Sequence, residues 1–236
     1  MLSLKLGQKI GSGRNLVTFS NKFSLSFDGV NDFVDLANAR GAFDTGAGTI
    51  SAWVKLNTTL INAPVFKWYV NANNQITIIY LQAANQLKFM YKGGGTNTQV
   101  VASSSIENDG NFHHVAMTWN TDANEFKAYV DGSQFGTTQT SFGTLSGTPT
   151  VFDLGYNRLS GSDFWNGLID EVSVFNSVKN ITDIYNSGTP TDLTGESGLT
   201  GYWRMEEGTG TTITSSTEGA ETGTLTNGTA FSTTVP

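Results

Sequence analysis

The alternation of apolar and polar residues with a period of two constrains this chain more than any other feature. It recurs in successive short runs between residues 23 and 176, separated by Gly, Asn and Asp. In the run at residues 49–56, for example, Ile50, Ala52 and Val54 share one face. Neighbouring side chains of a β-strand point to opposite faces, so each run predicts a strand with one buried face. Short strands separated by turn signals predict an all-β sandwich or barrel.

The predicted strands cover most of the chain. They span residues 23–28, 49–56, 63–70, 75–81, 86–92, 112–119, 125–132, 150–155, 166–176 and 199–205. A single segment has helical spacing, because Ile181, Ile184 and Tyr185 stand at positions i, i+3 and i+4. We predict one short helix within residues 178–187, with Asn180 as its N-cap. The tail beyond this last strand is rich in Gly, Thr and Ser, and it is either short edge strands or partly disordered.

Length and composition exclude several classes of protein. A chain of 236 residues with 38% hydrophobic and 14% charged residues is long enough to bury one large core. It has no cysteine, so no disulfide stabilises it. A net charge of −7 disfavours nucleic-acid binding, which needs a basic surface. No run of about 20 apolar residues predicts membrane insertion, and no signal peptide is expected at the N-terminus.

The two ends of the chain differ in charge and in composition. Residues 1–27 carry four basic residues and no acid, whereas residues 190–236 carry six acids against Arg204. This asymmetry is either chance on a solvated surface or an attraction between the ends or to a partner. We predict that residues 1–22 form a basic arm. The alternative is that Leu2–Leu6 form an edge strand of the same sandwich.

The jelly-roll domain itself is predicted to span residues 23–236. Within it, residues 188–198 are expected to form a turn-rich linker, and residues 199–236 to complete the same sandwich. The segment after the linker is too short to bury a core alone, yet it contains Tyr202, Trp203 and other apolar residues. These side chains must therefore pack on the main domain or on a neighbouring subunit.

The acidic and histidine pairs do not predict a catalytic site. Asp170 and Glu171 are adjacent in a strand, so we expect them to point to opposite faces. A retaining glycosidase places its two carboxylates about 5–5.5 Å apart, which this arrangement does not allow. His113 and His114 are adjacent in the same way, and we expect them to serve packing rather than metal binding. No catalytic residue is predicted.

Several segments together resemble the laminin G-like branch of the concanavalin A-like lectin/glucanase superfamily. They are FDGVNDFVDL (27–36), GTISAWVKL (48–56), FHHVAMTWN (112–120) with YVDG (129–132), and LGYNR (154–158) with FWNGLIDEVSVFN (164–176). Their order and spacing also match, over roughly residues 23–187. The resemblance implies a two-sheet antiparallel jelly-roll sandwich, often with calcium and with loops that bind carbohydrate or protein. GLTGYWRMEEGTGTTITSS (198–216) also resembles this family, in which it precedes the FDG strand, so a circular permutation is implied.

The resemblance also implies positions for a structural calcium ion. Asp28 and Asp170 match positions near calcium in many relatives, and Asp32 is a third contributor to consider. Carboxylate oxygens are ligands that Ca²⁺ prefers. The alternative is that Asp28 caps its own turn and that Asp170 accepts bonds from loop amides. The family's glucanases place acids at alternate positions of one strand, as Glu-x-Asp-x-Glu or a bulged variant, and this pattern is missing at residues 168–173.

A sugar-binding surface combines an exposed aromatic ring with hydrogen-bonding side chains. We predict such a surface at Tyr156, Asn157, Arg158, Asp163 and Trp165. The alternative is that Trp165 packs where the next strand begins. Trp residues inside the strand patterns, at positions 53, 119 and 203, are expected in the core.

These observations together predict a non-catalytic binding and display module. The resemblance extends to cysteine-free domains of virion proteins in tailed bacteriophages, which implies a protein on a virion surface as a capsid decoration, fibre or tail-associated part. Its partners would be a glycan or protein ligand, other virion proteins and further copies of itself. The alternatives are a free carbohydrate-binding lectin and a glycoside hydrolase or lyase.

Overall fold

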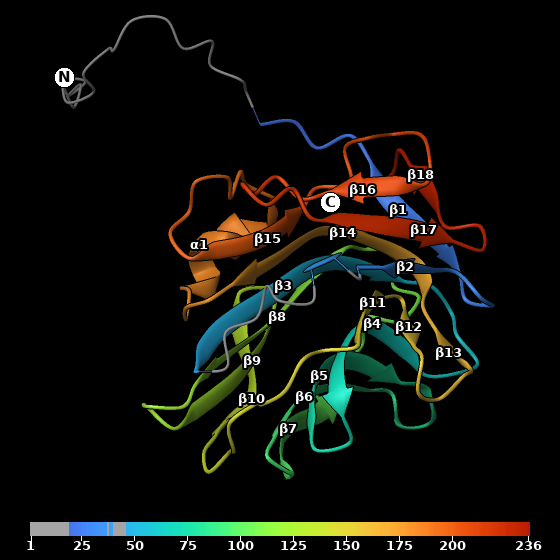
Figure 1. The fold of residues 1–236 in the computed structure, drawn as a ribbon. Helices are drawn as coiled ribbons and strands as arrows, with labels where there is room; N and C mark the ends of the chain where they lie inside the picture. Colours follow the sequence, from blue (N-terminus) through green and yellow to red (C-terminus); the bar gives the residue numbers. More distant parts are fainter. Residues whose placement is uncertain (1–18, 37, 40–45) are drawn as a thin grey trace, which may run out of the picture.

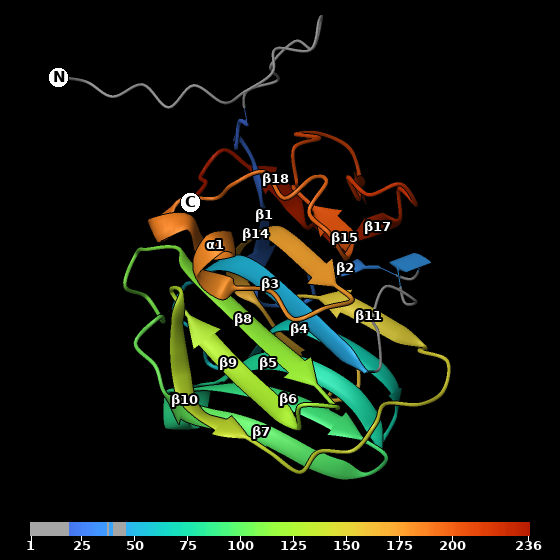
Figure 2. The same ribbon diagram turned by 90° about the vertical axis from the view of Figure 1, so that its left-hand side faces the viewer.

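Two antiparallel sheets of eight strands each face one another (Figures 1 and 2). The computed structural model describes residues 19–36, 38–39 and 46–236. Sheet A contains β1 (Ser24–Asp28), β3 (Ala47–Leu56), β8 (His113–Asn120), β9 (Glu125–Val130), β10 (Ser133–Gln139), β14 (Asn166–Phe175), β15 (Leu199–Trp203) and β18 (Ala230–Ser232). Its order is β10-β9-β8-β3-β14-β1-β18, and β15 pairs with β14.

Sheet B packs against one face of sheet A. It contains β2 (Phe33–Asp35), β4 (Ala63–Asn71), β5 (Asn74–Leu81), β6 (Gln86–Gly93), β7 (Thr96–Ser103), β11 (Val151–Leu154), β16 (Thr212–Thr214) and β17 (Thr222–Thr226). Its order is β16-β17-β2-β11-β4-β5-β6-β7. A small separate hairpin is formed by β12 (Tyr156–Asn157) and β13 (Asp163–Phe164). The predicted all-β sandwich is therefore confirmed.

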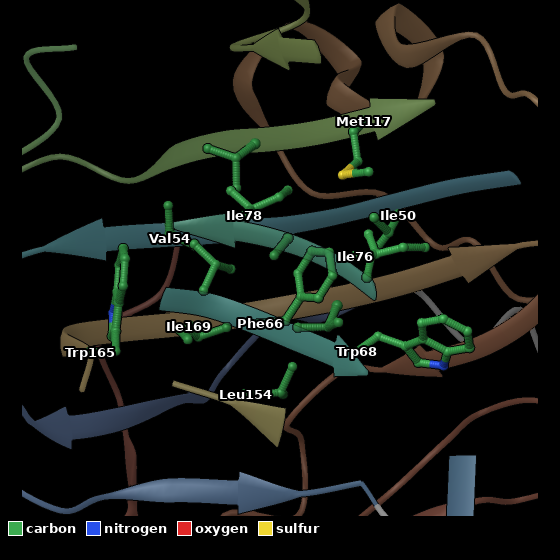
Figure 3. Packing of buried hydrophobic residues seen from close by; sticks show 14 of the residues in the cluster. Ile50, Val54, Phe66, Trp68, Ile76, Ile78, Met117, Leu154, Trp165 and Ile169 are labelled. Atoms are coloured by element: carbon green, nitrogen blue, oxygen red, sulfur yellow. The ribbon is translucent and has the colours of Figure 1, made fainter. Parts of the chain in front are cut away.

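The core lies between the sheets and follows the period of two. Ile50 and Val54 of sheet A face Phe66, Ile76 and Ile78 of sheet B, as Figure 3 shows. All five are at most 1% exposed. Each large apolar side chain buried in this way stabilises the fold by about 1.5–3 kcal/mol. Among the described residues, no helix is long and apolar enough to span a bilayer.

A second apolar cluster covers the outer face of sheet A. The predicted helix is present as α1 (Ile181–Tyr185), and the Asn180 side chain accepts a bond from the Thr182 backbone N–H, as expected for an N-cap. Short 3-10 turns occur at η2 (Gln82–Ala84) and η3 (Asn186–Gly188). Buried Leu193 packs in the same cluster as α1, so part of the segment expected as a linker lies against the sheet (Figure 2).

Two strands from opposite ends of the chain share one edge of β14. β1 pairs with residues 166–169 of β14, and β15 pairs with residues 172–175. The C-terminal strands thus lie in the same two sheets as the rest of the chain, with β18 beside β1 and β17 beside β2 (Figure 1). The glycine- and threonine-rich tail contains short strands, which is one of the two alternatives left open by its sequence.

β14 has a β-bulge between the part that pairs with β1 and the part that pairs with β15. Asp170 pairs with Trp53 while Ser173 pairs with Ser51, so β14 has one extra residue here, and Glu171 adopts a φ of 47°. The prediction that Asp170 and Glu171 point to opposite faces is wrong. Ile169 and Val172 both face the core, and the bulge leaves the two acids between them on the outer face. Asp170 accepts a bond from the Asn21 amide at 2.9 Å, and Glu171 accepts one from the Tyr202 hydroxyl.

Both carboxyl groups of the bulge are buried, with Asp170 0% and Glu171 4% exposed. Burial raises the pKa of Asp170 well above its usual value, and the nearby Glu171 carboxyl adds to the rise. Burial likewise raises the pKa of Glu171 to about 7, although Tyr202 and Arg204 oppose the rise. Protein therefore shields both carboxyl groups from solvent on this side of the sheet.

The chain entering β1 docks on the C-terminal segment. The Glu206 carboxylate accepts bonds from the backbone N–H groups of Lys22 at 2.7 Å and Phe23 at 3.1 Å. Arg204 donates to the Ser20 carbonyl at 2.7 Å and lies 4.4 Å above the Phe19 ring. The last four residues of the predicted arm therefore contact the domain, largely through backbone groups and an aromatic ring. The remainder of that arm, with Leu2–Leu6, lies outside the described residues.

We predict that Trp203→Ala will destabilise the whole domain. Trp203 is 0% exposed, donates from its indole nitrogen to the Glu221 carbonyl at 3.1 Å, and meets the Phe152 ring edge-on at 5.9 Å. Removing such a side chain costs about 3–5 kcal/mol. Urea unfolding followed by tryptophan fluorescence should show a single transition at lower urea. Leu60→Ala, at a position 88% exposed, is the control and should change little. If Trp203→Ala does not change the urea concentration at which the main sandwich unfolds, the C-terminal strands fold separately from it.

A second prediction concerns the pH dependence of stability at Glu171. The folded protein keeps this proton up to about pH 7, whereas the unfolded chain loses it near 4.5, so stability falls as pH rises through that window. Glu171→Gln cannot lose a proton. From pH 5 to pH 8, the free energy of unfolding of the unsubstituted protein should therefore fall by roughly 2–3 kcal/mol more than that of the variant. Urea titrations at both pH values measure this, and Glu218→Gln, at an exposed site, should behave like the unsubstituted protein.

Candidate functional site

The β12–β13 hairpin lies against β4 of sheet B. Ser160 shapes the loop that joins its strands: its hydroxyl donates to the Asn157 carbonyl at 2.9 Å and accepts from the Asp163 N–H at 3.0 Å. Gly161 follows with a φ of 73°, which favours glycine. The local sequence thus fixes a compact loop beside the outer face of the sheet.

Tyr156 and Arg158 hold this hairpin in place. The Tyr156 ring stacks on Phe164 with centroids 4.4 Å apart. Arg158 makes two bonds to the fully buried Asp153 carboxylate, at 2.8 and 2.5 Å, and an ion pair with Asp35 at 3.3 Å. These carboxylates raise the pKa of Arg158 above its already high value. Both predicted ligand residues therefore have protein partners that position the loop.

The prediction that Trp165 offers an exposed ring is wrong. Trp165 is 0% exposed, and its indole nitrogen donates to the Leu168 carbonyl at 3.3 Å. The period of two explains the burial, because Trp165 lies four residues before Ile169 and shares its inward face (Figure 3). The alternative, packing at the strand entry, is confirmed.

A groove of about 440 Å³ lies on the outer face of sheet B beside the hairpin. Side chains of β4, β5 and β6 point into it from the face opposite the core. The lining residues are Asn62, Lys67, Gln75, Thr77, Ile79, Leu81, Lys88, Met90, Asn157, Leu159, Ser160 and Asp163. The structure thus brings the predicted Asn157 and Asp163 together with residues that the sequence did not single out.

The polar groups of the groove include donors and acceptors with unused capacity. The Asn157 amide nitrogen donates to Asp163 at 3.1 Å, whereas its buried carbonyl oxygen has no hydrogen-bond partner in the described protein. Lys67 is only 4% exposed and donates to the Gln75 side chain. Burial, assisted by the charge of Lys88, lowers the pKa of Lys67 to about 8. Such a surface can bind a polar ligand.

The structure separates the two aspartates predicted to bind calcium. Asp28 pairs with Asn166, which precedes Asp170 by four residues, or about 13 Å of extended strand. Asp28 caps its own turn by accepting from the Val30 N–H at 2.8 Å, which is the alternative that the sequence left open. Asp32 lies beside it, accepting from the Asp28 N–H at 3.0 Å.

Asp32 is the aspartate of this turn that keeps a buried carboxylate oxygen without a protein partner. It is 3% exposed, its Oδ1 atom has no hydrogen-bond partner, and burial raises its pKa. Ca²⁺ takes about six to eight oxygens. Within the described ranges, no three acidic or histidine side chains gather closely enough to hold a metal ion. Backbone carbonyls and waters would have to supply most of the ligands.

The two histidines have separate environments. His113 lies between the Asp109 and Asp131 carboxylates, at 2.7 Å from each, and the bond to Asp131 is the main cause of its raised pKa. His114 is 0% exposed beside Trp53 and Tyr185, and burial lowers its pKa to about 4. Neither lines the groove. Trp53 is buried as predicted, but on the outer face of sheet A beneath Tyr185.

Several solved structures share this architecture, and bacterial proteins are among them. A Bacteroides ovatus protein, provisionally assigned to carbohydrate binding, aligns over 91% of this chain with a TM-score of 0.70 and 18% identity. The chain spans 60% of that protein's length. The CBM40 domain of the Ruminococcus gnavus IT-sialidase, bound to α2,3 sialyllactose, aligns with a TM-score of 0.58 and 12% identity, covering 70% of this chain and 96% of the domain.

A third structure belongs to part of an enzyme. Domain 4 of AbnA, a GH43 extracellular arabinanase from Geobacillus stearothermophilus, was solved in complex with arabinotriose. It aligns with a TM-score of 0.52 and 15% identity, over 70% of this chain and 76% of that domain. At these identities the likeness shows the fold alone.

The sequence itself was also compared with curated proteins and with family profiles. No curated protein matches it. A laminin G-type profile, described as the concanavalin A-like lectin/glucanases superfamily, matches residues 28–185. This range lies within the region of resemblance deduced from the motifs. The profile match covers more than half of the chain and agrees with its two-sheet architecture, and the chain therefore belongs to the concanavalin A-like lectin/glucanase superfamily.

Proposed function

We propose that this domain binds a saccharide in the groove on the outer face of sheet B, without chemical turnover. The observation that carries the proposal is the convergence of polar side chains from β4–β6 with the Asn157–Asp163 pair of the hairpin. Sugar hydroxyls both donate and accept hydrogen bonds, so they match the unpartnered Asn157 carbonyl and the Asp163 carboxylate. Apolar Ile79 and Met90 between them would contact the faces of sugar rings.

Binding partners of structurally similar proteins support a glycan as the ligand. The IT-sialidase domain was solved with sialyllactose and the arabinanase domain with arabinotriose. A glycoside hydrolase is the second candidate, because the latter domain is part of an arabinanase. Hydrolysis generally uses a pair of carboxyl groups across the scissile bond. Asp163 is the one acidic residue among those lining the described groove, which favours binding over hydrolysis.

We also propose that the domain is displayed on a virion surface, where residues 1–22 would attach it to a capsid or tail protein. The proposal rests on the sequence resemblance to phage virion proteins. Further copies of the chain would increase avidity for a glycan. The test is mass spectrometry of purified particles, combined with deletion of residues 1–18. The shortened protein should fold but be missing from the particle; if it is incorporated normally, the arm does not attach it.

Loss of the Asn157–Asp163 pair should weaken glycan binding. We predict that replacing Asn157 and Asp163 together by Ala lowers affinity for any glycan found on an array by about tenfold or more, because two hydrogen-bonding groups are lost. Asn97→Ala, at an exposed position on β7, is the matched control. Isothermal titration calorimetry measures affinity, and mass spectrometry of the incubated glycan detects products. Unchanged affinity would contradict the site, and shortened glycan would contradict the absence of turnover.

A structural calcium ion at the Asp28–Asp32 turn is a further proposal. If Ca²⁺ binds only the folded state, EDTA should lower the melting temperature and added Ca²⁺ should restore it. Asp32→Asn should remove this response, because it weakens the oxygen that has no other partner. Asp170→Asn is the control, since Asp170 lies at the bulge of β14, away from the Asp28–Asp32 turn. A response that Asp170→Asn abolishes and Asp32→Asn spares would place the ion at the bulge instead, and no response at all would exclude a stabilising ion.

A further inference from the structure

The groove concentrates positive charge on a protein whose net charge is −7. Lys67 and Lys88 line it from β4 and β6, on either side of β5. Neither lysine forms an ion pair with a carboxylate among the described residues, whereas Lys127 and Lys179 each pair with a glutamate elsewhere on the surface. The two groove lysines therefore carry charge that the protein itself leaves unbalanced.

The neighbouring acids do not neutralise Lys67. Asp153 stands opposite Lys67 in the β4–β11 register, but both of its oxygens accept bonds from Arg158. The hydrogen bond of Lys67 goes to the neutral Gln75 side chain. An ammonium group has three N–H donors, so donors remain for a ligand. A nearly buried charge in this setting gains most from an anionic partner.

The strand register directs Lys67 and Lys88 toward one region. Lys67 stands opposite Thr77 and Lys88 opposite Ile79, two residues further along the same face of β5. Their charges interact closely enough that Lys88 contributes to the lowered pKa of Lys67. An anion between them would relieve this repulsion. Asp163, the acidic residue of the groove, accepts a bond from Asn157 on the hairpin side.

We propose that the groove selects a saccharide carrying an acidic substituent, a carboxylate or a sulfate, bound between Lys67 and Lys88. The inference rests on the proposed function and narrows its ligand class. Asn157 and Asp163 contact hydroxyl groups of the same saccharide, so the acidic substituent and the sugar ring are recognised by different sides of the groove. Neutral saccharides of the same shape bind more weakly, because the lysines then lose water without gaining a counter-charge.

Matched pairs of saccharides test this selectivity. Isothermal titration calorimetry compares trigalacturonic acid with its fully methyl-esterified form, and 3′-sialyllactose with lactose. A 3′-sulfated lactose, which carries a sulfate and no carboxylate, is compared with lactose and separates sulfate from carboxylate recognition. We expect at least one acidic member to bind about 10- to 100-fold more tightly than its neutral counterpart, the range given by one charged hydrogen bond. The advantage should shrink as salt is raised, because screening weakens charge attraction.

Lysine variants locate the acidic subsite. Lys67→Met and Lys88→Met should each reduce the acidic preference about tenfold, whereas Lys55→Met, on sheet A, should leave it unchanged. Lys67→Gln serves as a second variant if the first unfolds, as melting temperatures would show. Preference retained in both groove variants, or equal binding of acidic and neutral saccharides, overturns the inference while leaving a glycan site in place. If no saccharide binds, whether acidic or neutral, both this inference and the proposed function are wrong.

The pH dependence of affinity distinguishes a lysine that binds the ligand from one that only stabilises the fold. The Lys67 amine loses its proton near pH 8 in the free protein, so affinity for the acidic saccharide should fall as pH rises from 7 to 9.5. Lys67→Met should flatten that profile. The other titratable or charged groups around the site are Tyr69, beneath the Lys67 ammonium, and Lys88, Asp153, Arg158 and Asp163. In Lys88→Met, affinity should still decline as pH rises, because Lys67 is still present. A decline of equal size in Lys67→Met would show that another group controls binding.

Discussion

The pairing of β14 is the constraint on which the architecture depends. One edge of this strand bonds to β3, and the other is divided between β1 and β15, which meet at the bulge. Asn21, Tyr202 and Glu206 supply the bonds that close this junction. With α1 and Leu193 packed over sheet A, that outer face is partly covered. The outer face of sheet B carries the groove. The β1–β15 junction and α1 therefore lie on sheet A, and the candidate site lies on the opposite side of the sandwich.

Most of the central strands and the helix could be predicted because their signals are local. Ile50, Ala52 and Val54 alternate cleanly, and Asn180 is a typical N-cap. The bulge was not predictable from local sequence, since it arises where two distant strands divide one edge of β14. The strands that were missed, such as Thr96–Ser103, contain mostly polar residues with little alternation. Their pairing depends on neighbours already in the sheet.

The candidate site was predicted in part. Asn157 and Asp163 do lie in the groove, whereas Tyr156 and Arg158 hold the hairpin against Phe33, Asp35 and Asp153. Whether a polar residue contacts the protein or faces solvent depends on partners distant in sequence, so composition alone could not separate these roles. Lys67 and Lys88 were missed for a different reason. Alternation places both on outward faces, but it does not reveal that a hairpin encloses those faces.

The long-range pairing of the first strand has a consequence for folding kinetics. Leu25 of β1 pairs with Ile169 on one side and with Phe231 on the other, and β2 pairs with β11 and β17. Contacts between residues so far apart in sequence close large loops, and proteins dominated by them fold slowly. During synthesis, β1 and β2 would wait for strands made at the end of translation. The unpaired edges of nascent chains would therefore be the main target for chaperones and the main risk of aggregation.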